Sequence, residues 1–384
     1  MPEPLIGLED VVVTTSTITF IDGEKGILRY RGYDVNELAK KSTYEEVAFL
    51  LLHGQLPQEA PLRAFEKMLR ANRAIPEGLV RILKAVPLKT DPISWLRTAV
   101  SALAAFDPEA DDNSEPANLR KAIRLTAQLG TLTAAIERIR RKKPLIEPDP
   151  ALNHAANFLY MLTGEQADDL SRRAMDIALI LQADHELNAS TFAGRVTIST
   201  LSDIYSGVTS AVGTLKGPLH GGANQKVMEM LQAIGTVDKA EPFIRELLAA
   251  KKKVMGFGHR VYTTIDPRAA ILKEMSKELS QRVGPAKWFE MSEVIERLMM
   301  GQKKIHPNMD FYSASVYQYL GIEIDLYPLI FAMSRVIGWC THFIEQYQNN
   351  RLIRPLTNYV GPSELIYAPL SARGEAPASP SPRL

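Results

Sequence analysis

The sequence predicts an all-α protein with one small β hairpin near its N-terminus. Three observations support this fold class. The 384 residues are 46% hydrophobic and 23% charged, which is the balance of a folded globular chain with two or three domains. Runs of β-branched and aromatic residues occur only near the start, and helix-capping signals divide the rest of the chain. The helical segments differ in length and have no fixed repeat, which argues against a solenoid.

The hairpin is predicted from two strand-like runs, residues 11–20 and 27–31, on either side of the turn at residues 22–26. The first helix follows because Ser42 with Glu45, and Thr43 with Glu46, each form a capping box, and Gly54 ends the segment. The same signals predict further helices over residues 58–73, 92–106, 116–141, 151–162, 168–185, 204–215, 223–234, 241–252, 267–282, 286–300, 311–320 and 328–348.

The spacing of glycines indicates how the helices are grouped. Between residues 217 and 321 the helices are separated by glycine-containing junctions, unlike the longer helices before them. We therefore expect a small domain over residues 217–321, inserted into a large helical domain formed by residues 1–216 and 322–384. Residues 371–384 hold three prolines among Ser, Ala and Gly, which predicts a flexible tail.

Charge and cysteine content exclude several classes of protein. With 45 basic and 44 acidic residues the net charge is +1, so no global field favours nucleic acid or anionic lipid. Cys340 is the only cysteine, which excludes an intramolecular disulfide and a cysteine-based zinc site and favours the cytoplasm. Residues 1–4 lack secretory features, so we expect no export. The most apolar long stretch, residues 326–340, is interrupted by Pro328 and Arg335 and is too short to span a bilayer.

Two histidines lie in glycine-rich junctions. His220, in the segment GPLHGGAN, directly precedes a predicted helix, whose N-terminus disfavours an imidazolium and favours a neutral hydrogen-bond donor to an oxyanion. The alternative is a glycine-rich cap with an incidental histidine. His259 follows Gly256 and Gly258, but no strand precedes this loop, so the glycines are not a dinucleotide fingerprint. Lys251–Lys253 before the loop are either a solvated helix end or phosphate ligands.

Arg335 is predicted to lie in an apolar stripe of its helix, where a guanidinium needs an anion. That anion is either a structural carboxylate or a substrate carboxylate. The same two alternatives apply to the anion that Arg354 would bind. Asp310 stands at a helix start, as an N-cap or as a carboxylate base. No metalloprotease, nucleophile-elbow, P-loop or EF-hand motif occurs.

These segments together resemble the citrate synthase family. The run GFGHRVYTTIDPR at 256–268 looks like the family signature. It is accompanied in order by DHELNAST at 184–191, GPLHGGAN at 217–224, NMDFYS at 308–313, Ser334-Arg335 and Arg354-Pro355. The resemblance extends from about Gly7 to Pro369.

The resemblance implies a mostly helical homodimer with a large and a small domain and the active site in the cleft between them. It also implies condensation of acetyl-CoA, as a substrate, with oxaloacetate and water to give citrate and CoA, without a cofactor or metal. Asp310 would remove a methyl proton, His220 would hydrogen-bond the thioester oxygen, and His259 would polarise the ketone. The resemblance further implies that oxaloacetate is held by His185, Arg268 and Arg335, with Arg354 reaching the other subunit's site, and that CoA contacts Lys253, Val254, Met255, Gly256 and Phe257.

Two other functions remain open at this stage. One is 2-methylcitrate synthase acting on propionyl-CoA, because an extra methylene changes pocket fit by only about 1 to 3 kcal/mol. The other is a non-catalytic CoA-binding or scaffold protein. Such a protein would explain the helices but not Asp310, His220 and His259 together.

Overall fold

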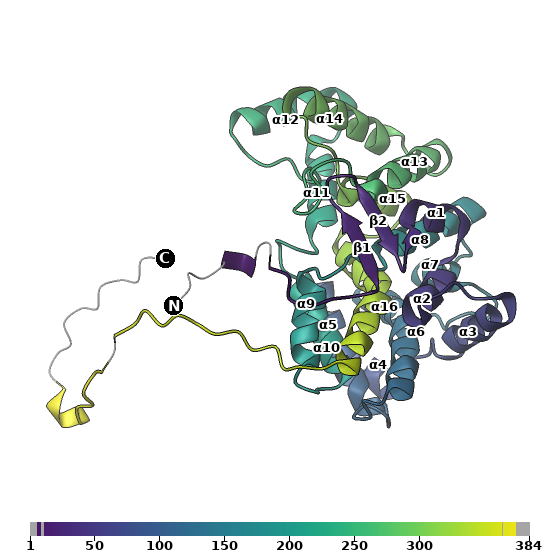
Figure 1. Cartoon of the computed structure of the whole chain (residues 1–384). Helices are drawn as coiled ribbons and strands as arrows, with labels where there is room; N and C mark the ends of the chain where they lie inside the picture. The colour runs from purple at the N-terminus through teal and green to yellow at the C-terminus, as the bar shows by residue number, and fades with distance from the viewer. Residues whose placement is uncertain (1–5, 9–10, 363, 374–384) are drawn as a thin grey trace. The chain divides into compact units, whose positions relative to one another are not determined.

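The computed structural model describes residues 6–8, 11–362 and 364–373 (Figure 1). The chain divides into two units, one made of residues 16–353 and the other of residues 1–15 with 354–384. The terminal unit contains two short 3-10 turns, η1 (Ile6–Leu8) and η4 (Leu370–Ala372). The tail predicted over residues 371–384 falls mostly on 374–384, outside the described residues.

The β element is a three-stranded antiparallel sheet in the order β1 (Thr19–Asp22), β2 (Ile27–Tyr30) and β3 (Tyr33–Asp34). Thr19 is opposite Tyr30 and Asp22 is opposite Ile27. The prediction of a strand over 11–20 is therefore wrong in length. At Thr17 the backbone N–H donates to the carboxylate of Glu345 on a distant helix, so this backbone pairs with a side chain instead of a strand.

Helices form the rest of the larger unit. They are α1 (Val35–Lys41), α2 (Tyr44–His53), α3 (Glu59–Ala71), α4 (Glu77–Ala85), α5 (Pro92–Leu103), α6 (Glu115–Arg140), α7 (His154–Thr163), α8 (Asp169–Gln182), α9 (Ala189–Ile198), α10 (Ile204–Leu215), α11 (Ala223–Ile234), α12 (Val237–Ala249), α13 (Pro267–Arg282), α14 (Lys287–Lys303), α15 (Met309–Tyr319) and α16 (Tyr327–Gln348), with 3-10 turns η2 (Ala104–Phe106) and η3 (Ile324–Leu326). The all-α prediction is confirmed.

Of the two capping signals at the first predicted helix, only that of Thr43 with Glu46 caps it, and the prediction for Ser42 with Glu45 is wrong because Ser42 is the C-cap of α1. The hydroxyl of Thr43 accepts the backbone N–H of Glu46, and Gly54 ends α2 in the left-handed conformation with φ of 82°. By contrast, α1, α4 and α9 lie outside the predicted segments. Helix α9 is rich in Ser, Thr, Gly and β-branched residues, which are poor helix formers, and it is stabilised by packing against α10 and α16.

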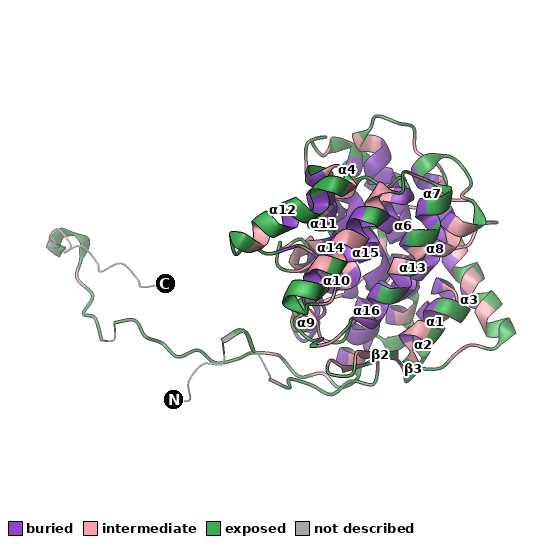
Figure 2. Cartoon of the chain, turned by 90° about the horizontal axis from the view of Figure 1, so that it is seen from above, coloured by how far each residue is buried: buried purple, intermediate pink, exposed green. Residues whose placement is uncertain are grey.

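The core surrounds α16, which is buried over almost its whole length (Figure 2). It packs against α2, α5, α6, α8, α9, α10 and α11. A helix that is apolar on all faces belongs in the interior of a large domain. Residues on α16 are therefore held rigidly, with water excluded from around them.

Helices α11 to α15 pack mainly on one another. α13 and α11 both contact α15, and α12 lies beside α14 (Figure 1). Contacts to the rest of the unit run from α13 to α1 and α8, from α15 to α8, and from α11 to α16. The domain boundaries at 217 and 321 stay a prediction. Among the residues described, no helix is long and apolar enough to cross a membrane.

Candidate active site

His220 lies just before α11, in a junction that packs against α9 and α16. Its Nε2 is 2.8 Å from the hydroxyl oxygen of Ser190, the second residue of α9. The indole Nε1–H of Trp339 on α16 donates to the same oxygen at 3.1 Å. Ser190 and Trp339 are fully buried. Three elements far apart in sequence therefore hold one imidazole.

The proton positions in this cluster follow from donor and acceptor chemistry. An indole can only donate, so Ser190 accepts from Trp339 and has one proton left to give. The Ser190 hydroxyl is 2.7 Å from the Asn188 side-chain oxygen, which accepts its proton in one arrangement, and 2.8 Å from His220 Nε2, which accepts it in the other. Donation to His220 Nε2 places the ring proton on Nδ1, whereas donation to Asn188 places it on Nε2, which then donates to Ser190. Burial, with the nearby Arg335 charge, lowers the pKa of His220 to about 4, so the ring is neutral at pH 7.

His259 is fixed by the backbone of its own loop. Its Nδ1 accepts the N–H of Val261 at 3.0 Å and that of Tyr262 at 3.3 Å. An amide N–H cannot accept, so Nδ1 carries no proton and the neutral ring carries it on Nε2. Burial and the Arg268 guanidinium lower the pKa of His259 to about 4. The ring is a neutral donor through Nε2.

The loop before His259 is joined to the start of α15 by backbone hydrogen bonds. Gly258 N–H donates to His306 O at 3.2 Å, and Asn308 N–H donates to Gly256 O at 2.9 Å. Gly256 has φ of 81°, and a Cβ there would lie 2.8 Å from the Phe311 ring, so only glycine fits. This bridge ties His259 to the helix that carries Asp310.

Asp310 is not the N-cap of α15. That position is Asn308, whose side-chain oxygen accepts the backbone N–H of Asp310 at 3.0 Å. The N-cap alternative for Asp310 is therefore wrong, and its carboxylate accepts no hydrogen bond from the described residues. Burial raises its pKa to about 6, although the Arg268 charge acts in the opposite direction. A half-buried carboxylate with this pKa can take up a proton near neutral pH.

Arg268 has a carboxylate partner. Its Nε and Nη2 donate to the two oxygens of Asp266, both at 2.9 Å. Asp266 also caps α13 and accepts the N–H of Met309 at 3.1 Å. The Asp266 charge raises the pKa of Arg268, which stays fully charged in a buried position.

Arg335 has no such partner. Its Nε donates to the carbonyl of Gln182 at 2.6 Å, and its guanidinium lies over the Phe331 ring, 4.7 Å from the ring centroid. Within the described ranges no carboxylate comes within 4.0 Å of Arg335, which is 1% exposed. The charge of the buried Asp184 carboxylate acts on Arg335 without forming an ion pair with it, so the choice between a structural and a substrate carboxylate stays open. Burial lowers its pKa to about 10, which still leaves the guanidinium charged at pH 7.

His185 lies close to His259. The ring centroids are 5.3 Å apart, and His185 Nε2 is 3.2 Å from the hydroxyl of Tyr262. Burial and the Arg268 charge lower the pKa of His185 well below its ordinary value. The structure thus brings His185 and His259 together, and the Arg268 charge acts on both rings and on Asp310. His220 lies near the Phe331 ring that Arg335 covers, 6.1 Å between the His220 and Phe331 centroids.

The predicted CoA segment follows α12. Lys253 is exposed, Val254 and Gly256 are buried, and the Phe257 ring packs against that of Phe311 with centroids 4.6 Å apart. Its contacts with CoA stay a prediction. Arg354 belongs to the terminal unit and is exposed, so its role also stays a prediction.

Four residues near the site have roles that the sequence does not indicate. They are Ser190, Tyr262, Asp266 as an arginine partner, and Asp184, whose carboxylate accepts from Thr19, His342 and the N–H of Glu186. Only Asp266 carries a local signal, as an N-cap. The others act through contacts between distant segments, which no local pattern reports.

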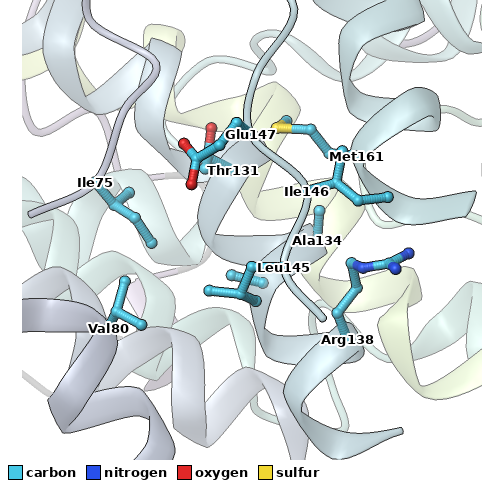
Figure 3. A pocket seen from close by; sticks show the side chains of 10 residues that line it. Ile75, Val80, Thr131, Ala134, Arg138, Leu145, Ile146, Glu147 and Met161 are labelled. Atoms are coloured by element: carbon cyan, nitrogen blue, oxygen red, sulfur yellow. The ribbon is translucent and has the colours of Figure 1, made fainter. Parts of the chain in front are cut away.

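Two cavities differ in whether candidate residues line them. One of about 100 Å³ is lined by His259, Tyr262, Asp266 and Asn308, among others, and opens beside the histidine loop. The other, about 50 Å³, lies between α4, α6 and α7 and is lined by Ile75, Val80, Thr131, Arg138 and Met161, among others (Figure 3). It has room for a few waters only, and no candidate residue lines it.

Comparison with known proteins decides the family. The model described as "Citrate synthase, C-terminal domain" matches residues 7–356. The chain belongs to the citrate synthase family. It is 50% identical to citrate synthase 2 of Bacillus subtilis, over 96% of this chain and 98% of that protein. It is 41% identical to 2-methylcitrate synthase of Mycobacterium tuberculosis, over 95% of this chain and 92% of that protein.

A solved citrate synthase from Thermoplasma acidophilum has the same fold. Its TM-score is 0.90 at 37% identity, covering 96% of this chain and 98% of that one. That relative was solved as a ternary complex with carboxymethyl coenzyme A and oxaloacetate. The present chain is therefore an enzyme of the citrate synthase family with the family's all-α fold.

Proposed function

We propose that the protein condenses acetyl-CoA with oxaloacetate and water to give citrate and CoA. The observation that carries this proposal is Arg335, a buried guanidinium with no carboxylate within 4.0 Å in the described chain. Its charge acts on the neutral rings of His185 and His220 and on Asp310, whose pKa is raised. A buried unpaired charge is costly, so such a site is built for an anionic ligand. A dianionic keto acid meets that requirement.

The first step is removal of a proton from the methyl group of acetyl-CoA by Asp310. The C–H electron pair moves to the thioester, whose oxygen becomes negative. In this step Ser190 donates to Nε2 of His220, and the ring donates Nδ1–H to the thioester oxygen. Preorganised donors at a developing oxyanion typically contribute several kcal/mol, which a carboxylate base alone cannot supply.

The second step joins the two substrates. The enol carbon attacks the ketone of oxaloacetate, and His259 gives its Nε2 proton to the oxygen that becomes the alkoxide. Water then attacks the thioester carbonyl of citryl-CoA, which releases citrate and the CoA thiol. Side chains supply every proton transfer before hydrolysis, so the mechanism uses no cofactor or metal.

Oxaloacetate is proposed to bind between Arg335, Arg268 and His185. The terminal guanidinium nitrogens of Arg335 make no hydrogen bond within the described chain, and one edge of Arg268 faces Asp266. The Thermoplasma relative was solved with oxaloacetate and a CoA analogue, which supports this ligand pair. Residues 253–257 would contact CoA.

We further propose a homodimer in which Arg354 reaches the partner's site, with the small domain at residues 217–321 closing over the substrates. In the terminal unit, large apolar side chains are exposed at Leu356, Val360 and Ile366, by 89%, 91% and 95%. Such residues suit an arm that packs on a second subunit.

The alternative substrate is propionyl-CoA, which the name of the Mycobacterium relative favours. The test compares kcat/KM for acetyl-CoA and propionyl-CoA with saturating oxaloacetate, following thiol release. We expect acetyl-CoA to be preferred, and a preference for propionyl-CoA would assign the 2-methylcitrate reaction instead. Absence of thiol release with either substrate would favour a non-catalytic CoA-binding protein. The Asp310→Asn variant provides the inactive control.

A further inference from the structure

Tyr262 lies among the groups proposed to bind the keto acid, although none of the steps above uses it. It is 4% exposed, and its ring centroid is 4.7 Å from that of His259 and 5.7 Å from that of His185. The Arg268 guanidinium carbon is 5.9 Å from the centroid of the same ring. Tyr262 therefore neighbours three of the residues proposed to act on oxaloacetate.

Tyr262 makes one contact through its backbone and another through its side chain. Its backbone N–H donates to His259 Nδ1 at 3.3 Å, which fixes its position relative to that imidazole. Its hydroxyl is 3.2 Å from Nε2 of His185, in a T-shaped arrangement of the two rings. Within the described chain no residue besides Tyr262 hydrogen-bonds a ring nitrogen of His185 through its side chain. Without this hydroxyl, packing would mainly set the ring orientation.

We propose that Tyr262 is a positioning residue that orients His185 toward oxaloacetate through the hydrogen bond between its hydroxyl and His185 Nε2. The inference rests on the proposed role of His185 in binding the keto acid. Burial raises the pKa of Tyr262, so the phenol keeps its proton at pH 7 and can donate it to the neutral imidazole. The proton of His185 then resides on Nδ1. One residue thereby sets the spacing between the two imidazoles.

The test is Tyr262→Phe, which removes one oxygen and keeps both the ring and the backbone bond to His259. We expect KM for oxaloacetate to rise about 2- to 10-fold, the range of a net hydrogen-bond contribution. KM for acetyl-CoA at saturating oxaloacetate should stay the same, and kcat should change less than about twofold. The matched control is Tyr205→Phe, since Tyr205 is also a buried tyrosine but its hydroxyl donates to Asp107, away from the site. In this control KM for oxaloacetate should not change.

A double-mutant cycle with His185→Gln separates positioning from a general structural effect. If Tyr262 acts through His185, Tyr262→Phe adds less than about twofold to KM in the His185→Gln background. A full additional increase there, or an unchanged or lowered KM in the single variant, overturns the inference. If His185→Gln raises KM while Tyr262→Phe does not, the inference alone fails. If His185→Gln leaves KM unchanged, the proposed role of His185 fails as well.

Discussion

The hydroxyl oxygen of Ser190 lies 2.8 Å from Nε2 of His220, and both residues precede or begin helices that pack on α16. The contact sets which ring nitrogen of His220 faces the acyl thioester in the proposed reaction. The contribution of this contact to the reaction rate can be measured by replacing the serine, because Ser190 itself touches no proposed substrate atom. The same cluster includes the indole of Trp339, which keeps the serine oxygen in place.

Ser190→Ala should lower kcat about 3- to 10-fold, because His220 loses the partner that orients its Nδ1 proton. KM for oxaloacetate should change little, since the serine contacts no proposed oxaloacetate ligand. Steady-state kinetics at saturating oxaloacetate provides the measurement. Ser206→Ala is the control, because Ser206 on α10 bonds to its helix N-cap, Asp203, and to no candidate residue. An unchanged kcat in Ser190→Ala would contradict the role of this contact.

The pKa of Asp310 predicts how activity depends on acidity. Because the carboxyl group has a pKa of about 6, the base is protonated below that pH, and kcat/KM should fall about tenfold per pH unit on the acid side. Asp310→Asn should abolish this condensation while oxaloacetate binding persists. Turnover above a few per cent of the wild-type rate would remove Asp310 from the proposed role.

The same raised pKa predicts the effect of Asp310→Asn on stability. The folded state binds this proton more tightly than the unfolded state, so the stability due to the group is present below about pH 4 and is lost as pH rises through about 6. At about pH 7.5 the Asn variant should therefore have a higher Tm than the wild type, and the difference should vanish below about pH 4. Thermal unfolding by circular dichroism at both pH values checks this. A lower Tm for the variant at the higher pH would contradict it.

Arg335 and Arg268 should respond differently to replacement by methionine. Arg335→Met removes a buried charge without breaking an ion pair, so Tm should be unchanged or raised while KM for oxaloacetate rises about 100-fold. Arg268→Met leaves Asp266 buried without its partner, which should cost about 3 to 5 kcal/mol of folding free energy. Denaturant unfolding and KM separate the two effects. Equal losses of stability would show that Arg335 has a structural anion.

Gly338 on α16 packs directly against the turn that carries His185. A Cβ at this position would lie 2.3 Å from the carbonyl oxygen of Ala183 and 2.4 Å from Oδ1 of Asp184. Gly338→Ala should therefore destabilise the fold by about 1 to 3 kcal/mol and raise KM for oxaloacetate. In the control Gly213→Ala, the added carbon meets only the Arg97 side chain at 3.6 Å, so stability should stay the same or rise. Equal behaviour of the two variants would contradict this account.

Local chemistry explains which parts of the fold can be predicted from the sequence. Caps such as Thr43, Gly54 and Asp266 act within a few residues of their helix ends, so sequence patterns locate them. Helix α9 is not predicted because packing, and not its own residues, stabilises it. Its Gly194 lies so close to α16 that a Cβ there would be 2.2 Å from the Phe343 ring. Close approach between helices has no local signature.

The site is predictable only in part for the same reason. Glycine-rich junctions mark His220 and His259, but the choice between N-cap and base for Asp310 needs the geometry of Asn308. The choice between structural and substrate carboxylate for Arg335 needs its full surroundings. Ser190 and Tyr262 act through partners far along the chain, 30 residues away for Ser190 with His220 and 77 for Tyr262 with His185.

The backbone bridge between Gly256–Gly258 and His306–Asn308 has a consequence for variation of this enzyme. These backbone hydrogen bonds fix the position of the proposed proton donor His259 relative to the proposed proton acceptor Asp310. Substitutions that tilt α15 to admit a bulkier acyl chain would therefore carry both groups along and keep their mutual alignment. Substitutions meant to enlarge the acyl pocket should therefore target side chains that face the thioester. Substitutions that break the bridge would misalign His259 and Asp310 and so impair both proton transfers.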